Sequence, residues 1–139
     1  MKKEAVIKVL SLQVGNEEDA IEVVTQGNFY KKENSYYAVY EETELSGMEG
    51  TTTTLKIKDD EFSLIRRGTT NTKMEFINKD DSISMYNTPY GTLELVISTK
   101  ELDIDIDDKG GDVFIDYYLT VDGQKAANTK LKVNIKANN

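Results

Sequence analysis

The chain contains no cysteine and no histidine. Without cysteine it has no disulfides, no thiolate nucleophile and no thiolate metal ligand. Without histidine it lacks the commonest general base in enzymes and the commonest ligand of transition metals. These two absences exclude Ser–His and Cys–His catalysis and zinc chemistry. We therefore predict neither a metal site nor a cofactor.

Proline and long hydrophobic runs are also scarce. Pro89 is the only proline, and no Ser/Gly/Pro-rich tract divides the 139 residues. Because linkers are usually marked by such tracts, we predict a single domain over residues 1–139. No stretch of 18 apolar residues occurs, so we predict no membrane-spanning helix.

Positive charge is in short supply, since the formal net charge is −8. An acidic chain is repelled by phosphate backbones and by anionic lipids, so we expect neither nucleic acid nor a membrane as partner. The first residues resemble a signal peptide only briefly, because Glu4 follows the lysines and Lys8 interrupts the apolar stretch. We expect a cytoplasmic protein.

Short runs of alternating apolar and polar residues fill most of the chain. They include residues 55–58, 93–98, 113–121 and 130–136, and turn-forming clusters separate them. The last two runs predict a hairpin whose turn, Asp122-Gly123, suits a two-residue type I′ turn. This repeated pattern of short alternating runs and turns indicates an all-β protein of roughly nine to eleven strands.

Two changes of parity favour a closed antiparallel barrel over a sandwich. The apolar set shifts from Ile7 and Val9 to Leu10 and Leu12, and again between residues 93–97 and 102–106. A β-bulge or bend in a long strand returns the apolar side chains to one interior face, as small barrels require. The alternative is a pair of short strands joined by a turn at each place.

Residues 41–57, EETELSGMEGTTTTLKI, form the most unusual segment. It holds acidic residues that include Glu42, Glu44 and Glu49, and four consecutive threonines. Thr51 and Thr53 share a strand face with Leu55, so their hydroxyls are expected to point into the barrel, where each needs a partner or a ligand. The alternative is that threonine serves only as a good strand former and that the carboxylates lie in water.

Arg66 shares the parity of Leu64 and is expected to point inward with it. A buried guanidinium needs either an anionic ligand or a carboxylate partner from the chain itself, and both possibilities stay open. Tyr40 and Tyr90 each combine an apolar ring with one polar group, which suits a ligand cavity but also ordinary strand packing. Met48 suits an adaptable pocket or an irregular core.

The strings that are least ordinary here also resemble a known family. EETELSGMEGTTTTLKI at 41–57, LIRRG at 64–68 and TPYGTLEL at 88–95 are similar to those of the YwiB-like family of uncharacterised bacterial proteins, a domain of unknown function. The resemblance implies a calycin-like, or lipocalin-like, β-barrel. It implies no activity and carries no established catalytic residue.

The leading functional prediction is that a non-enzymatic barrel binds a small amphipathic ligand in its interior. The predicted ligand-binding residues are Tyr40, Glu42, Glu44, Met48, Thr51, Thr53, Arg66 and Tyr90. This hypothesis requires an interior cavity of about 300 Å3 or more, the lower end for ligand pockets.

Two alternatives belong to other classes. A structural or protein-interaction module, including a homodimer, would act through Phe114 and Tyr118, which alternate with the inward set and should face outward. An enzyme would use Glu42, Glu44 or Glu49 as acid and base.

Overall fold

The protein is described by a computed structural model that covers residues 2–15, 18, 20–44, 47–69, 71–88 and 90–138. Within this part of the chain there are ten strands, and none of the described residues is in an α-helix. The strands are β1 (Lys3–Gln13), β2 (Ile21–Lys32), β3 (Ser35–Glu41), β4 (Thr51–Ile57), β5 (Glu61–Gly68), β6 (Thr72–Ile77), β7 (Asp81–Thr88), β8 (Gly91–Asp107), β9 (Gly110–Val121) and β10 (Gln124–Ala137).

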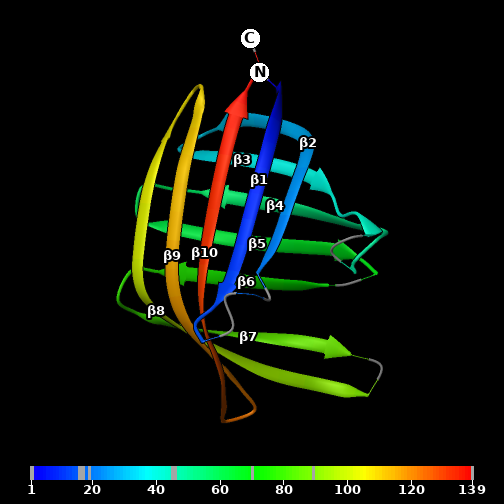
Figure 1. The fold of residues 1–139 in the computed structure, drawn as a ribbon, viewed down its shortest axis with the longest axis vertical. Helices are drawn as coiled ribbons and strands as arrows, with labels where there is room; N and C mark the ends of the chain where they lie inside the picture. Colours follow the sequence, from blue (N-terminus) through cyan, green and yellow to red (C-terminus); the bar gives the residue numbers. More distant parts are fainter. Residues whose placement is uncertain are drawn as a thin grey trace.

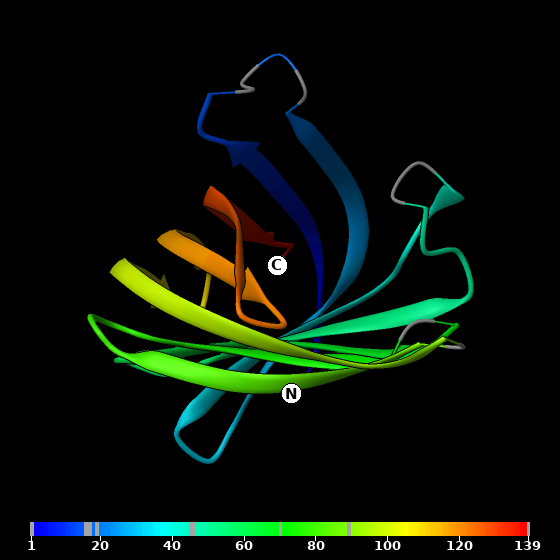
Figure 2. The same ribbon diagram turned by 90° about the horizontal axis from the view of Figure 1, so that it is seen from below.

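All ten strands form one antiparallel sheet in the order β6-β5-β4-β3-β2-β1-β10-β9-β8-β7. The long strands β8, β9, β10 and β1 lie across β3 to β6, and the sheet curls round to enclose an apolar interior (Figure 1, Figure 2). The all-β antiparallel prediction is confirmed. The barrel is nearly closed rather than closed, because β6 and β7 are the two edges of the sheet and no ladder joins them.

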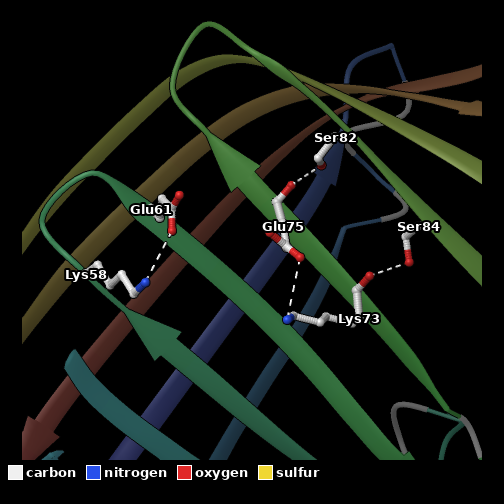
Figure 3. Close-up of polar contacts among 6 residues, drawn as sticks. All are labelled: Lys58, Glu61, Lys73, Glu75, Ser82 and Ser84. Carbon is white, nitrogen blue, oxygen red and sulfur yellow. Dashed lines mark hydrogen bonds and ion pairs between the residues drawn. The ribbon is translucent and has the colours of Figure 1, made fainter. Parts of the chain in front are cut away.

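Side-chain hydroxyls partly replace the missing ladder between β6 and β7. Ser82 and Ser84 of β7 donate hydrogen bonds to the backbone carbonyls of Glu75 and Lys73 of β6 (Figure 3). At the end of the seam, the backbone N–H of Leu102 donates to Oδ1 of Asn78, 3.1 Å away. The predicted closure is therefore wrong at this one seam, because the two strands offer each other side chains rather than paired backbone groups.

The interior is filled by the residues that the alternation placed there. Leu55, Ile57, Ile97, Val113 and Ile115 are all buried. Their neighbours in the sequence, such as Lys56 and Asp112, face the outside. Because side chains on successive strand residues point to opposite faces, one apolar residue in two suffices to build the core.

The terminal hairpin has the predicted turn. Asp122 and Gly123 have φ of 48° and 80°, and Val121 pairs with Gln124. Positive φ at both central residues is the signature of a type I′ turn, so this prediction is confirmed. The turn also holds β8, since the N–H of Glu94 donates to Oδ1 of Asp122 at 2.8 Å.

One of the two parity changes is a bulge and the other is not. In β8 the register with β9 shifts between Thr99 and Glu101, which turns both Ile97 and Leu102 inward, as predicted. In β1 the pairing with β10 runs from Ala5 to Gln13 without a shift. The predicted bend in β1 is wrong, because Leu10 and Leu12 lie partly exposed on the outer face instead of turning inward.

Gly27 marks the point where β2 leaves β3. Pairing with β3 starts at Asn28 opposite Val39, whereas β2 pairs with β1 over residues 21–29. A Cβ atom at Gly27 would lie 2.3 Å from the carbonyl oxygen of Val39, so only glycine allows this close approach. The divergence leaves the first half of β2 free to line an interior cavity.

No helix among the described residues has the length and apolarity needed to cross a membrane.

Candidate functional site

A cavity of about 240 Å3 lies inside the barrel. Its polar lining includes Tyr40, Glu42, Arg66 and Tyr117, and its apolar lining includes Val23, Met48, Leu64, Met74, Phe76 and Leu131. The cavity does not reach the 300 Å3 that the ligand hypothesis was expected to require, because Phe76, Leu131 and the other large side chains fill much of the interior, so that requirement is not met. It has room for a small ligand only.

The polar wall is a row of residues that pair across four strands. Tyr40 of β3 lies opposite Thr53 of β4, Thr53 opposite Arg66 of β5, and Arg66 opposite Thr72 of β6. Residues paired directly across an antiparallel sheet present their side chains on the same face. The register therefore gathers these four side chains at one level of the barrel interior.

Glu42 sits immediately beyond this row and forms the central ion pair of the site. Its Oε2 lies 3.7 Å from Nε of Arg66, and the side chains are 2% and 21% exposed. The Thr53 hydroxyl donates a hydrogen bond to the same Oε2. A carboxylate partner for Arg66, one of the two possibilities left open by the sequence, is thus present.

The ion pair does not satisfy the guanidinium. Nε of Arg66 is buried and has no hydrogen-bond partner among the described residues, because 3.7 Å exceeds the usual limit of about 3.2 Å. The hydroxyl of Thr72, which follows Arg66 in the row, is also buried and has no hydrogen-bond partner among the described residues. Buried donors normally have acceptors, so two such groups side by side indicate a place that a ligand or ordered water can fill.

Two tyrosines of the cavity keep their protons to unusually high pH. Burial raises the pKa of Tyr40 above its ordinary value of 10, and the nearby charge of Glu42 raises it further. Burial also raises the pKa of Tyr117. Both phenols remain neutral at physiological pH and can donate a hydrogen bond.

The structure brings together most of the predicted ligand-binding residues. Tyr40, Glu42, Met48 and Arg66 line the cavity, and Thr53 lies behind Glu42. Thr51 points inward as predicted, but its hydroxyl shares a 2.8 Å hydrogen bond with Thr69.

Two of the predicted residues lie elsewhere. Glu44 is exposed in the segment between β3 and β4. Tyr90 is 99% exposed at the tip of the β7–β8 hairpin. Neither is among the cavity-lining residues.

The carboxylates needed for the enzyme hypothesis are not gathered either. Among the described residues, Glu42 is the one carboxylate that lines the cavity, while Glu44 and Glu49 are exposed. Glycosidase-type acid and base chemistry uses a pair of carboxylates across one site. The described cavity does not supply that pair.

The apolar lining was harder to foresee. Leu64, Phe76 and Leu131 read as ordinary core residues in the sequence, and nothing there separates a core position from a cavity wall. Tyr117 could have been found, since it shares the inward parity of Val113 and Ile115.

The outer surface carries a second, larger hollow of about 580 Å3. Leu10 and Phe114 lie in it, with Lys8 and Lys132 on the β1–β10 side and Asp103, Asp105 and Asp112 on the β8–β9 side. Phe114 faces outward as predicted. Tyr118 also faces outward, but Nζ of Lys125 and of Lys100 lie 4.1 and 4.9 Å from its ring centroid, so its faces are partly covered by cations.

Three comparisons with known proteins agree. The family model described as "Domain of unknown function (DUF1934)" matches residues 7–133. The "Uncharacterized beta-barrel protein YwiB" of Bacillus subtilis (strain 168) is 33% identical over 108 residues, which are 77% of this chain and 73% of that protein. The crystal structure of the ywiB protein from Bacillus subtilis aligns with a TM-score of 0.81 at 24% identity, over 99% of this chain and 94% of the other.

Proposed function

The chain belongs to the DUF1934 family, to which no function is attached, and from that premise we propose that the barrel interior binds a small amphipathic molecule. The resemblance to a YwiB-like family is confirmed by these matches. The nearly closed antiparallel barrel is the shared fold, whereas the calycin or lipocalin subtype stays a prediction. The proposal is carried by the site.

The observation that carries the proposal is one buried guanidinium nitrogen without a hydrogen-bond acceptor among the described residues, on a side chain that is 21% exposed. Arg66 Nε is buried and unpartnered among the described residues, and it lines a cavity that also has an apolar wall of Leu64, Met74 and Phe76. Ligand sites typically combine a mainly apolar lining with a few convergent polar groups. A small molecule with an acceptor at one end and a short apolar body matches this combination.

The volume sets the size of the ligand. Since a water molecule takes about 30 Å3 of liquid, 240 Å3 corresponds to about eight waters. A drug-sized or long-chain ligand would exceed the volume of the cavity and would extend out of it.

The experiment is a titration of the 15N-labelled protein with six-carbon probes, 1-hexanol and hexanoate, observed by NMR. We expect amide shifts at Tyr40, Leu64, Arg66 and Met74. A variant with the cavity filled, Leu64→Phe, should lose them, and Ile83→Phe, on the outer face of β7, should retain them. Shifts confined to the outer surface, or equal shifts in the filled variant, would disprove interior binding.

A second candidate function is favoured by the charges around the outer hollow. Lys132 of β10 and Asp103 of β8 form no ion pair with another described residue, and they lie on either side of Phe114 of β9, while Glu22 of β2 lies at the far edge of the hollow. A second copy of the chain, turned by half a revolution about an axis that runs along β9, would place Lys132 over Asp103. We propose this homodimer, with Phe114 at its centre, as the alternative function.

The dimer is tested by sedimentation at low ionic strength. Lys132→Glu should dissociate it, and adding Asp103→Lys should restore it, because the exchanged charges again face each other. A monomer at all concentrations, or no rescue by the second change, would disprove the dimer. Tyr118 contributes less, since Lys100 and Lys125 already cover its ring.

A further inference from the structure

We propose that the head group bound in the cavity is a carboxylate, so that the ligand class is a short-chain monocarboxylic acid held by Arg66. The inference rests on the proposed binding function and names its ligand. It follows from the donors and acceptors in the cavity, from the geometry of the ion pair, and from the position of the apolar wall.

Donors outnumber acceptors on the cavity wall. The guanidinium of Arg66 offers N–H groups and no acceptor, and the neutral phenol of Tyr117 can donate one hydrogen bond, whereas the phenol of Tyr40 already hydrogen-bonds with Glu42. The single carboxylate of the described lining, Glu42, already accepts from Thr53. An ionised carboxylate has only acceptors, so it complements this wall better than an alcohol, an amide or an amine.

The geometry of the ion pair leaves the guanidinium available. Glu42 approaches Arg66 through Nε at 3.7 Å, too far for a hydrogen bond, and this buried Nε has no other partner among the described residues. The guanidinium fork matches the two oxygens of a carboxylate, which it binds through two parallel hydrogen bonds. A ligand carboxylate can therefore use donors that Glu42 does not use.

Glu42 and the ligand then compete for one cation. A carboxylate hydrogen-bonded to Arg66 lies nearer to the guanidinium than to Glu42, so attraction exceeds repulsion, but the repulsion weakens binding. Removing the charge of Glu42 should consequently tighten the binding of an acid. A neutral ligand would not respond in this way.

The apolar body of the ligand has its place beside the head group. Leu64 of β5 and Met74 of β6 pair directly with each other, and this pair lies next to the Arg66–Thr72 pair on the inward face. Phe76 lies two residues beyond Met74 on the same face. An acid bound to Arg66 would extend its chain along this wall. The 240 Å3 cavity has the volume of about eight waters, which limits the alkyl chain of the ligand to about six carbons.

The experiment compares hexanoate, 1-hexanol and hexylammonium at pH 7 by NMR titration. We expect hexanoate to bind at least tenfold more tightly than either matched probe. Arg66→Lys, which keeps the charge but removes the fork, should weaken hexanoate at least tenfold, and Glu42→Gln should strengthen it. Arg67→Lys is the matched control, because Arg67 is exposed on the next residue of the same strand and should bind like the wild type.

The outcomes separate the two proposals. If 1-hexanol binds in the cavity as tightly as hexanoate, the carboxylate inference is overturned while interior binding stands. If none of the three probes shifts the cavity amides, both are overturned. If Arg66→Lys does not fold, the ratio of hexanoate to 1-hexanol affinity in the wild type decides the head group by itself.

Discussion

Thr53 and Arg66 are direct partners in the register of β4 and β5, and the carboxylate of Glu42 contacts both. The hydroxyl of Thr53 holds the carboxylate, and the carboxylate balances the guanidinium. This arrangement keeps a charged pair inside a barrel that is otherwise mainly apolar. It also makes the stability of the barrel depend on a site that we assign to binding.

Removal of the carboxylate charge tests that dependence. Glu42→Gln leaves the guanidinium of Arg66 without a counter-charge, which costs about 3–5 kcal/mol for a fully buried pair. Because Arg66 is 21% exposed, we expect a smaller loss of about 2–3 kcal/mol in the free energy of unfolding, measured with urea at pH 7.

Two further variants define the cause. Adding Arg66→Met to Glu42→Gln should recover most of the loss, since no uncompensated charge remains. Glu41→Gln is the matched control, because Glu41 is exposed and accepts a hydrogen bond from Thr52 on the outer face. An equal loss in the control would show that the ion pair is not responsible.

Much of this site was predictable because strand parity is a strong constraint. Because residues two apart in a strand share a face, Arg66 was expected to point inward with Leu64, and Thr53 with Leu55. Arg66 and Thr53 do point inward. Tyr90 was misplaced for a different reason: it was judged by its side-chain chemistry, although Pro89 and Gly91 on either side of it favour a turn and so a hairpin tip. Local sequence patterns determine which face of a strand carries a given side chain. The position of the cavity depends instead on which strands face each other across the barrel.

The same limit explains the errors in the fold. The parity change in β8 is a bulge and that in β1 is not, although the two patterns look alike in the sequence. Leu10 stays outside because β1 keeps an unbroken register with both β10 and β2, so no extra residue turns its side chain inward. The unsealed seam was equally hidden, since β6 and β7 each have the pattern of an ordinary strand.

Alkaline pH should destabilise the protein through its buried phenols. The pKa of Tyr40 is raised in the folded state, so above about pH 10, the ordinary value, the unfolded chain loses the phenolic proton while the folded chain keeps it. The stabilisation is complete below pH 10 and is lost as the pH rises. Each such tyrosine contributes a slope of about 1.4 kcal/mol per pH unit.

The measurement is the free energy of unfolding between pH 9 and 11.5. Tyr40→Phe should reduce the slope above pH 10 by about one proton, or about 1.4 kcal/mol per pH unit. Tyr118→Phe, on the outer face, serves as the control for loss of a phenol hydroxyl. An unchanged slope in Tyr40→Phe would show that this phenol ionises alike in both states.

Gly27 should tolerate no side chain. A Cβ atom there would lie 2.3 Å from the backbone oxygen of Val39 and 2.7 Å from Cδ1 of Ile7, so the backbone of β2 or β3 must move. We expect Gly27→Ala to cost about 2–3 kcal/mol, in the range of overpacked cores. Thr25→Ala, two residues away in the same strand, should cost less than about 1 kcal/mol in the same urea titration. A loss below 1 kcal/mol for Gly27→Ala would mean that the strands separate freely here.

The seam between β6 and β7 gives the last prediction. The hydroxyls of Ser82 and Ser84 bond to the carbonyls of Glu75 and Lys73, where a closed barrel would have backbone ladder bonds (Figure 3). Each is worth about 1 kcal/mol, so Ser82→Ala with Ser84→Ala should cost about 1–2 kcal/mol.

The effect should also be local. Without the two hydroxyls, the edge of β6 opens more often, so amide hydrogen exchange should accelerate more at Met74 and Phe76, whose N–H groups face β5, than in β9. Ser98→Ala is the matched control, because the Ser98 hydroxyl forms no hydrogen bond with another described residue. Exposed strand edges also template association, so the double variant should form more high-mass species on gel filtration. Uniform acceleration across all strands would instead indicate global destabilisation, and the serines would then not act as the closure of the seam.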